Sequence, residues 1–387
     1  MKIAIYHNLP SGGAKRALYE QIKHTKAHHE YHLYRFDFDA NESYLDLRPM
    51  VKEVFNYSLG DNYRFSALRD LRKIDQLQRK IAADIDAAGY DLVYVTHCQF
   101  TQSPGVLKYL STPSLYYIHE PRRQDYEYNI MHHNVGMFSG AKGALKHMAN
   151  NRVHSYDVES ARSSTRQICN SYFTQENILR SYGLYAQVCY QGIDSQLFQV
   201  AKSRPDMPYV LSVGAIDPFK GHMLTLEALS NISKQYQPKF VIVADRGSER
   251  HRAELQSLAS NRSVDLDIQS QVTDSELTQL YGQASMVVCA AELEPFGLTP
   301  LESMACGTPV VAIRQGGYKE TVVEGVNGWF ADQSVTSLSQ VIADVLSGSK
   351  KPELSGQKLH DYVAKQWSWQ SGAKNLEAAY QSFMELP

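Results

Sequence analysis

The sequence predicts an α/β protein made of two doubly wound parallel sheets. Short apolar, β-rich runs alternate with helical stretches along the chain, and such continuous runs are typical of parallel strands covered on both faces. The runs form two sets, and 387 residues are too many for one compact domain and comfortable for two. Between the sets, Gly192 interrupts the pattern, and the linker-like segment 203–208 follows.

The expected strands are rich in Val, Ile, Leu, Tyr and Phe, and the intervening stretches are long enough for helices. In the first set the strands are 2–6, 31–36, 91–96, 114–118, 166–169 and 186–190. In the second set they are 209–213, 239–244, 264–268, 286–290, 309–313 and 328–331.

Two stretches of the first set, 55–80 and 121–160, contain no clear strand. The second of them is rich in Tyr, His, Asn and Arg, and its length suggests a functional surface. A last helix is expected over roughly 370–384. We therefore divide the chain into domains 1–195 and 196–368 and a C-terminal segment, 369–387, whose helix returns to the N-terminal domain.

Composition is that of an ordinary globular protein, with 43% hydrophobic and 21% charged residues and a net charge of −2. No apolar run approaches the roughly 18 residues of a membrane span, and the apolar run at the N-terminus is too short for a signal peptide. A small basic excess in the N-terminal half is too weak to indicate nucleic acid, but it leaves an anionic acceptor or peripheral membrane association open. The five cysteines lack CxxC spacing and are expected to be isolated thiols of a cytoplasmic protein, placed in the cytosol or at the inner face of the membrane.

The segment 294–302, Glu-Pro-Phe-Gly-Leu-Thr-Pro-Leu-Glu, brackets a tight turn with two carboxylates. We expect Thr299 to be the N-cap of a short helix, with Pro300 at its first position and Glu302 completing a capping box. An expected strand ends just before this segment, so the helix N-terminus would lie at the carboxyl edge of a sheet, where it suits phosphate. The alternative is that Glu302 only caps its own helix and Glu294 is a solvated loop acid.

The spacing Glu294-x7-Glu302, followed by the apolar and glycine pattern of 303–312, closely resembles the signature of the GT4-type retaining glycosyltransferases. The resemblance continues, in order along the chain, at 12–14, 119–120, 191–194, 212–214, 220–221, 272–277, 316–317 and 324–329. It implies the GT-B fold, in which two Rossmann-like domains face a central cleft. It also implies that the N-terminal domain binds the acceptor and the C-terminal domain binds a nucleotide-sugar, with no cofactor and no essential metal.

For the donor, the resemblance implies that Glu302 binds the ribose hydroxyls, Glu294 contacts the transferred sugar and Lys220 neutralises the leaving pyrophosphate. In a metal-free site a cation must stabilise the charge of that pyrophosphate. It also places Val272 in the donor site. The sugar and pyrophosphate would face the backbone N–H groups of Phe296, Gly297, Leu298 and Thr299.

One position departs from the family pattern. Many members carry an arginine directly after the Val-Gly pair that precedes Lys220, and this chain has Ala215 there. Arg246 and Arg314, which each follow an expected strand, are the two candidates for a substitute cation.

In the N-terminal domain, the resemblance places the loop Gly12-Gly13 beside the donor phosphates and the acceptor. Glycines at this point allow the backbone to approach a ligand closely. His119, at the end of a strand, is expected near the reacting centre. Arg16, Glu120 and His132 are candidate acceptor contacts.

Two other patterns look like metal sites but are not interpreted as such. Asp37-Phe38-Asp39 has the spacing of a metal-binding DxD motif, yet it lies far along the chain from the donor block. The pairs His28-His29 and His132-His133 have no further ligands at metal-binding spacing.

The sequence therefore predicts a retaining hexosyltransferase that uses a nucleotide-sugar, with a UDP-sugar as the expected donor. The acceptor is a hydroxyl of a glycan, a lipid-linked glycan or another molecule, as in polysaccharide biosynthesis. Retention would follow from departure and attack on one face of the sugar. The alternatives are a GT-B sugar-nucleotide epimerase, a phosphorylase, or a non-catalytic nucleotide-sugar-binding subunit, the last of which is suggested by Ala215.

Overall fold

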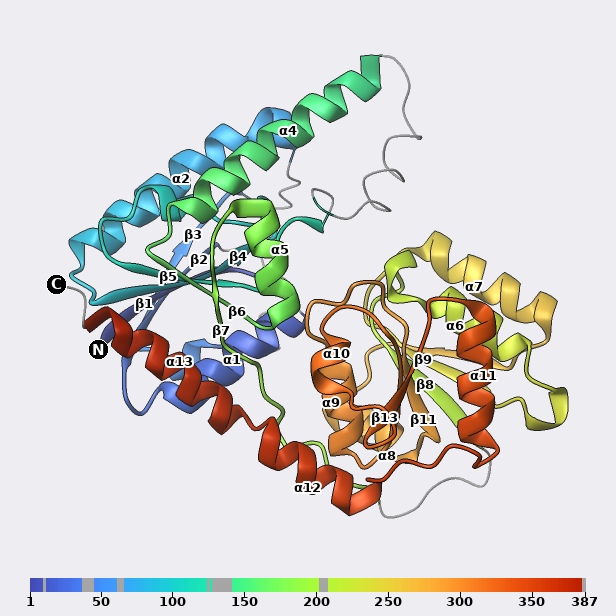
Figure 1. The fold of residues 1–387 in the computed structure, drawn as a ribbon. Coiled ribbons are helices and arrows are strands. Elements are labelled where there is room, and N and C mark those ends of the chain that lie inside the picture. Colours follow the sequence, from blue (N-terminus) through green and yellow to red (C-terminus); the bar gives the residue numbers. More distant parts are fainter. Residues whose placement is uncertain are drawn as a thin grey trace. The chain divides into compact units, whose positions relative to one another are not determined.

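The computed structural model describes residues 1–9, 12–36, 45–60, 66–123, 126, 141–201 and 208–384. The chain divides into two compact units, Met1–Gln191 with Trp369–Pro387 and Gly192–Ser368 (Figure 1). Most of the linker-like segment, the Asp37–Asp39 motif and the His132-His133 pair lie outside the described residues.

The first unit is built on a parallel sheet with the strand order β3-β2-β1-β4-β5-β6-β7. Its strands are β1 Lys2–Asn8, β2 Glu30–Phe36, β3 Glu53–Tyr57, β4 Leu92–Cys98, β5 Ser114–Ile118, β6 Arg166–Cys169 and β7 Gln187–Val188. Its helices are α1 Gly13–Thr25, α2 Ala67–Ala87, α4 Ala141–Arg162, α5 Tyr172–Tyr182 and α13 Trp369–Met384, with 3-10 turns η1 Arg48–Met50 and η2 Gly105–Lys108.

The second unit has a parallel sheet with the strand order β10-β9-β8-β11-β12-β13. Its strands are β8 Tyr209–Val213, β9 Lys239–Val243, β10 Leu266–Gln269, β11 Met286–Cys289, β12 Val310–Ile313 and β13 Gly328–Ala331. Its helices are α6 His222–Ser230, α7 Glu249–Arg262, α8 Asp274–Gln283, α9 Leu298–Ala305, α10 Tyr318–Thr321, α11 Val335–Leu346 and α12 Gly356–Gln366, with 3-10 turns η4 Pro218–Lys220 and η5 Lys234–Tyr236.

Apolar residues cover both faces of the first sheet, as continuous apolar strands require. Along β1, Ala4 and Tyr6 join a core beneath α2, whereas Ile3 and Ile5 join the opposite core. That opposite core includes Leu18 of α1 together with residues of α13. Figure 1 accordingly shows α2 and α4 on one face and α1 and α13 on the other.

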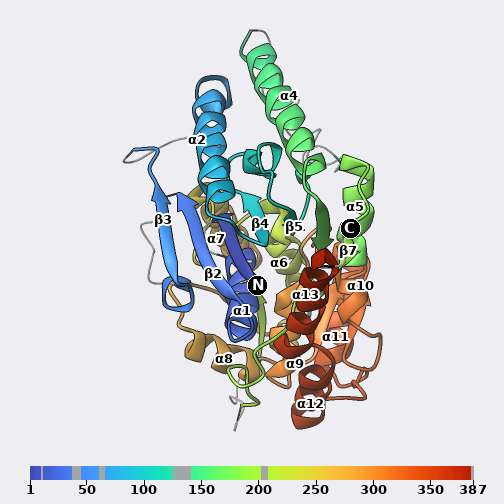
Figure 2. The same ribbon diagram turned by 90° about the vertical axis from the view of Figure 1, so that its left-hand side faces the viewer.

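One strand was missed in the sequence. The expected strandless stretch began at residue 55, but β3 occupies Glu53–Tyr57 at the edge of the sheet beside β2 (Figure 2). Its residues are only half-buried or exposed, so it lacks the continuous apolar pattern of the central strands. Tertiary packing specifies it instead, because Phe55 stacks on Tyr34 of β2 with ring centroids 4.5 Å apart.

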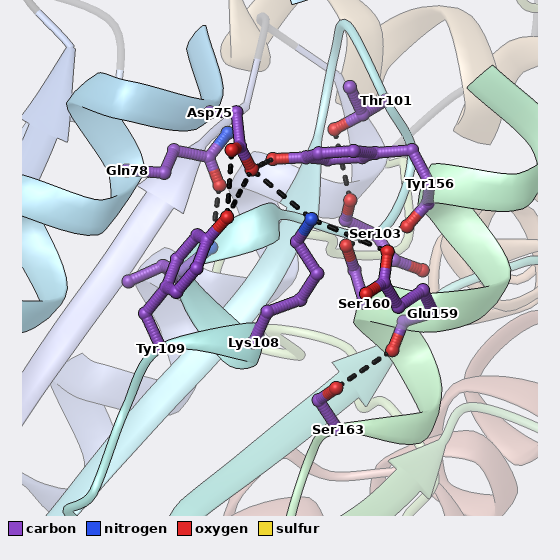
Figure 3. Close-up of polar contacts among 11 residues, drawn as sticks. Asp75, Gln78, Thr101, Ser103, Lys108, Tyr109, Tyr156, Glu159, Ser160 and Ser163 are labelled. Atoms are coloured by element: carbon purple, nitrogen blue, oxygen red, sulfur yellow. Dashed lines mark hydrogen bonds and ion pairs between the residues drawn. The ribbon is translucent and has the colours of Figure 1, made fainter. Parts of the chain in front are cut away.

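A polar cluster joins α2, η2 and α4 (Figure 3). The Asp75 carboxylate of α2 accepts hydrogen bonds from the hydroxyls of Tyr109 and Tyr156, at 2.7 and 2.9 Å. Lys108 Nζ lies 3.2 Å from the same carboxylate and 4.0 Å from the centre of the Tyr156 ring. Gly105 makes room for that ring, because a Cβ there would lie 1.7 Å from the Tyr156 hydroxyl oxygen.

The five cysteines are all buried free thiols, which confirms that none of them forms a disulfide. No helix in the described part of the chain is long and apolar enough to cross a membrane. Within the same residues, no group of three or more His, Cys, Asp or Glu side chains could hold a metal ion.

Candidate functional site

The loop between β11 and α9, residues 290–297, carries Glu294 at the carboxyl edge of the second sheet. Backbone hydrogen bonds hold it on both sides: Glu292 N–H donates to Phe219 O at 2.8 Å, and Gly317 N–H donates to Glu294 O at 2.8 Å. Gly316 allows this close approach, because a Cβ there would lie 2.4 Å from Glu294 O. The glycines at 316–317 therefore shape the loop that presents Glu294.

Glu294 forms an ion pair with Lys220, the last residue of η4. Lys220 Nζ lies 2.7 Å from Glu294 Oε2, and the two side chains are 33% and 19% exposed. The lysine stem lies beside Gly214, where a Cβ would be 3.6 Å from Lys220 Cδ. The structure thus brings together two residues to which the family resemblance gives separate roles, Glu294 at the sugar and Lys220 at the pyrophosphate.

The expected capping box at Thr299 and Glu302 is wrong. Gly297, with φ 87°, is the N-cap, so α9 begins at Leu298 and Thr299 lies inside its first turn. No side chain caps the helix. The same Thr-x-x-Glu pattern does form a capping box one helix earlier, at Thr273 and Glu276 of α8, directly after the half-buried Val272.

Glu302 is instead a buried acid, 8% exposed, whose Oε2 accepts a hydrogen bond from the Tyr281 hydroxyl at 2.7 Å. Burial, with the charge of Glu302, raises the pKa of Tyr281 well above its ordinary value, so the phenol stays protonated and donates. The interpretation of Glu302 as a helix cap alone is therefore also wrong. Nothing in the sequence around Tyr281 indicated this partner.

The remaining residues before α9 contribute backbone rather than side chains. Phe296 is 2% exposed and its ring lies 5.8 Å from that of Trp367. Because its side chain is buried, only its backbone can face a ligand. The N–H groups of the first turn of any α-helix have no acceptor within the helix, and Leu298 and Thr299 occupy that turn here.

The loop that carries Ala215 is braced by His222. This side chain is 1% exposed; Ser212 Oγ donates to its Nδ1 and its Nε2 donates to Ala215 O, each at 3.1 Å. Burial lowers the pKa of His222 to about 4, so the ring is neutral near pH 7. With Nε2–H donating to the Ala215 carbonyl, Nδ1 is left as the acceptor for Ser212.

The two candidates for a substitute cation have different surroundings. Arg246 is exposed in the loop next to Ala215, where its carbonyl accepts a hydrogen bond from Ile216 N–H at 2.9 Å. Arg314 is paired with Glu324 at 3.0 Å and lies over the Phe330 ring. Arg246 is therefore the better placed of the two.

In the first unit, Gly12 is the N-cap of α1, and Arg16 lies half-buried in its first turn. The half-buried Glu120 follows His119, and its carbonyl accepts a hydrogen bond from Gln102 Nε2 at 2.7 Å. Gly13 is exposed, and His132 lies outside the described residues.

His119 directly follows β5 and is 6% exposed. Its carbonyl accepts a hydrogen bond from Asn170 Nδ2 at 3.1 Å, and its Nδ1 lies 3.2 Å from Gln191 Nε2. Burial, with a smaller contribution from His97, lowers the pKa of His119 well below its ordinary value. Because Gln191 donates to Nδ1, the ring proton resides on Nε2. In the sequence, Gln191 stands out only as the first residue of the family-like segment 191–194.

Two family models match the chain, "Glycosyltransferase Family 4" over residues 11–197 and "Glycosyl transferases group 1" over residues 194–359. The chain belongs to the GT4-type glycosyltransferases. An uncharacterized glycosyltransferase of Methanocaldococcus jannaschii is 28% identical over 245 residues, which are 59% of this chain and 60% of that protein. The D-inositol 3-phosphate glycosyltransferase of Corynebacterium urealyticum is 29% identical over 45% of this chain and 43% of its own length. The matches thus span less than two thirds of these relatives.

Solved structures establish the GT-B fold across the whole chain. Sucrose-phosphate synthase from Thermosynechococcus elongatus superposes with a TM-score of 0.79 at 18% identity, covering 99% of both chains. HepE from Anabaena, in complex with UDP and glucose, gives 0.75 at 19% identity and covers 99% of this chain and 100% of its own. At these identities the likeness concerns the fold.

Proposed function

We propose that this protein is a retaining glycosyltransferase that moves a hexose-type sugar from a UDP-sugar to a hydroxyl of a glycan or lipid-linked acceptor, without an essential metal ion. The observation that carries the proposal is the Lys220–Glu294 ion pair beside the open N-terminus of α9. It combines a cation, a carboxylate and backbone donors in one place, which matches the phosphate and hydroxyl groups of a nucleotide-sugar.

Each part of the donor has a partner in this arrangement. The Glu302 carboxylate, oriented by Tyr281, accepts from the vicinal ribose hydroxyls. The pyrophosphate lies at the N–H groups and positive dipole end of α9. When the donor binds, the Lys220–Glu294 ion pair opens. Lys220 then pairs with a phosphate oxygen, and Glu294 accepts hydrogen bonds from hydroxyls of the sugar. Arg246 supplies a second positive charge, because Ala215 stands where many family members carry an arginine.

In the transfer step, the bond from the anomeric carbon to the phosphate oxygen breaks and its electron pair leaves with the nucleoside diphosphate. The acceptor hydroxyl attacks the same face, and its proton passes to the departing phosphate. Lys220 stabilises the charge that develops on the phosphate. Neutral His119 carries its ring proton on Nε2, so its ring acts as a hydrogen-bond donor to a sugar oxygen and not as the base. The acceptor is bound by the first unit, with contacts from the Gly12-Gly13 loop, Arg16, Glu120 and His132.

Related structures support the choice of donor. HepE from Anabaena has been crystallised with UDP-glucose and with UDP and glucose, and TarM from S. aureus with UDP. These ligands are properties of those proteins, and the site described above is the reason to expect a similar donor here.

Donor binding is tested by thermal shift against UDP-, GDP- and ADP-sugars. A ligand at 100 times its Kd stabilises the folded state by ~2.7 kcal/mol, so the correct donor should raise the melting temperature measurably. The variants Lys220→Ala and Glu294→Gln should lose transfer activity by roughly 100- to 1,000-fold. Lys319→Ala removes an exposed lysine of α10 and serves as the matched control. No shift with any nucleotide-sugar would refute the donor site.

The reaction class is tested on the product. Proton NMR should show the anomeric configuration of the donor retained, and activity should persist in a metal chelator. An inverted product would refute the mechanism. Conversion of the donor to its epimer, or phosphorolysis of a glycan, would indicate the other two enzyme classes. A chain that binds the donor yet never hydrolyses or transfers it would be a non-catalytic subunit.

A further inference from the structure

A groove of about 500 Å³ lies beside the edge strand β7, within the first unit. β7 pairs only with the second half of β6, at Ile168 and Cys169. In the described part of the sheet, Arg166 and Gln167 have no strand beside them on this side, and they border the groove. Residues of α5 and the loop after it form one side, and α13 contributes Ala379 and Ser382 to the other.

The lining of this groove is aromatic and amide-rich. Tyr172 and Tyr185 both line the groove and are 61% and 74% exposed. Gln175 lies between them in the sequence and Gln187 lies two residues after Tyr185; both line the same groove, and Arg166 is the one charged residue among its described lining residues. Exposed aromatic faces cover the apolar faces of sugar rings, and amides donate to and accept from hydroxyls. This lining therefore matches an uncharged, polyhydroxylated ligand better than an anionic one.

Two chain segments link the groove to the surroundings of His119. Asn170, two residues before Tyr172, donates to the carbonyl of His119, and Gln191 donates to its ring. Tyr190, the neighbour of Gln191, packs edge-to-face on Tyr172 with ring centroids 6.2 Å apart. Both chain segments that hold His119 thus lead directly to one end of the groove.

From that end the groove passes Gln175 in the first turn of α5, whose Nε2 donates to the carbonyl of Ala186 at 2.7 Å, and reaches Tyr185 on the loop after the helix. Its volume of about 500 Å³ is larger than one sugar ring. A ligand that fills the groove and touches both tyrosines is therefore a chain of more than one unit.

We propose that this groove binds the distal units of a neutral oligosaccharide acceptor, whose terminal hydroxyl lies at His119. The proposal rests on the glycosyltransferase function proposed above and assigns its acceptor to the class of extended, uncharged glycans. Tyr172 and Tyr185 stack against successive sugar rings, while Gln187, Arg166 and the Oε1 atom of Gln175 bond to their hydroxyls; the Nε2 atom of Gln175 donates to Ala186 O. A single sugar unit at His119 does not reach Tyr185.

The test compares acceptor length in binding and in catalysis. Gluco-, manno- and galacto-oligosaccharides of one to six units are titrated against the protein by saturation-transfer NMR, and the transfer rate is measured with each that binds. In Tyr185→Ala and Gln187→Ala, the affinity for the hexasaccharide should fall roughly two- to ten-fold, with a matching rise in KM. The affinity for the monosaccharide should not change. Tyr236→Ala removes an equally exposed tyrosine of the second unit, at 67% exposure, and is the matched control.

Melting temperatures establish that each variant is folded. The proposal is overturned if none of the three oligosaccharide series binds more tightly as its chain length increases. It is also overturned if Tyr185→Ala and Tyr236→Ala have the same affinity for the hexasaccharide. It is also overturned if Tyr185→Ala lowers the mass of the protein in solution, because the tyrosines would then be a contact between copies of the chain. Length-dependent binding that needs Tyr185, in a protein that shows no donor shift or transfer, would refute the proposed function while leaving the groove as a glycan site.

Discussion

At the scale of single residues, the candidate site depends on side chains that orient other side chains. Tyr281 fixes the Glu302 carboxylate and Gln191 fixes the ring of His119, and all four are buried. A buried polar group that loses its partner keeps the full cost of leaving water. These pairs therefore affect both stability and the geometry offered to a substrate.

Tyr281→Phe should weaken donor binding without touching the donor. The change removes the hydrogen bond to Glu302 Oε2 and should lower the free energy of unfolding by about 1–3 kcal/mol. We expect KM for the donor to rise more than kcat falls. Tyr209→Phe is the control, because it removes a hydroxyl that bonds the Leu280 carbonyl in the same unit. Equal donor KM values for the two variants would contradict the role given to Tyr281.

Gln191→Glu should move the ring proton of His119. Gln191 donates to Nδ1 in the native protein, whereas a carboxylate would accept from Nδ1–H and raise the pKa of the ring. With ¹⁵N-histidine labelling, NMR should show the proton on Nε2 in the native protein and on Nδ1, or on both nitrogens, in the variant. A native ring protonated on Nδ1 would contradict this assignment.

At the scale of elements, the glutamate loop between β11 and α9 is shaped by backbone contacts with η4 and with the turn before α10. The sequence located this loop because its two acids and its glycines lie close together in the chain. It misplaced the helix start by assigning the cap to Thr299, because Gly297 adopts a backbone conformation open mainly to glycine and begins α9 earlier. β3 was missed for another reason, since it is a half-exposed edge strand held by aromatic stacking.

A comparison of Gly316→Ala with Gly325→Ala distinguishes the effect of backbone strain from the effect of crowding the loop that carries Glu294. Both glycines have positive φ, 56° and 77°, so each alanine should cost about 1–2 kcal/mol in unfolding free energy. Only Gly316 faces the Glu294 backbone, with a Cβ position 2.4 Å from its carbonyl, while no atom lies within 4 Å at Gly325. Urea unfolding should show both losses, and only Gly316→Ala should also raise the donor KM. A normal donor KM in Gly316→Ala would show that the loop tolerates displacement.

At the scale of the whole molecule, each of the two α/β units carries a neutral, buried histidine, His119 in the first unit and His222 in the second. The pKa of His222 in the second unit falls to about 4, and that of His119 in the first unit also lies well below its ordinary value. Both shifts arise from burial, which penalises the charged ring. The folded protein therefore binds fewer protons than the unfolded chain in mild acid.

Stability should consequently decrease as the pH falls through the window from about 6.5 to 4. An unfolded histidine titrates near 6.5, so the contribution of His222 is fully present above that pH and is lost toward its folded pKa of about 4. At pH 5 this single group should cost about 2 kcal/mol relative to pH 7. Urea unfolding at a series of pH values measures the slope, which should be shallower in His222→Gln. An unchanged slope would mean that His222 is already protonated in the folded state.

The sequence by itself determined the two parallel α/β units, most strand positions and the acidic loop at a sheet edge, because each follows from patterns within a few residues. The tertiary structure alone decided which groups meet: Glu302 with Tyr281, Lys220 with Glu294, and His119 with Gln191 are separated by 21, 74 and 72 positions. Parallel strands require long crossovers, so residues far apart in the chain arrive at the same carboxyl edge. Which of them then touch depends on side-chain packing and burial, and the local sequence pattern does not encode either.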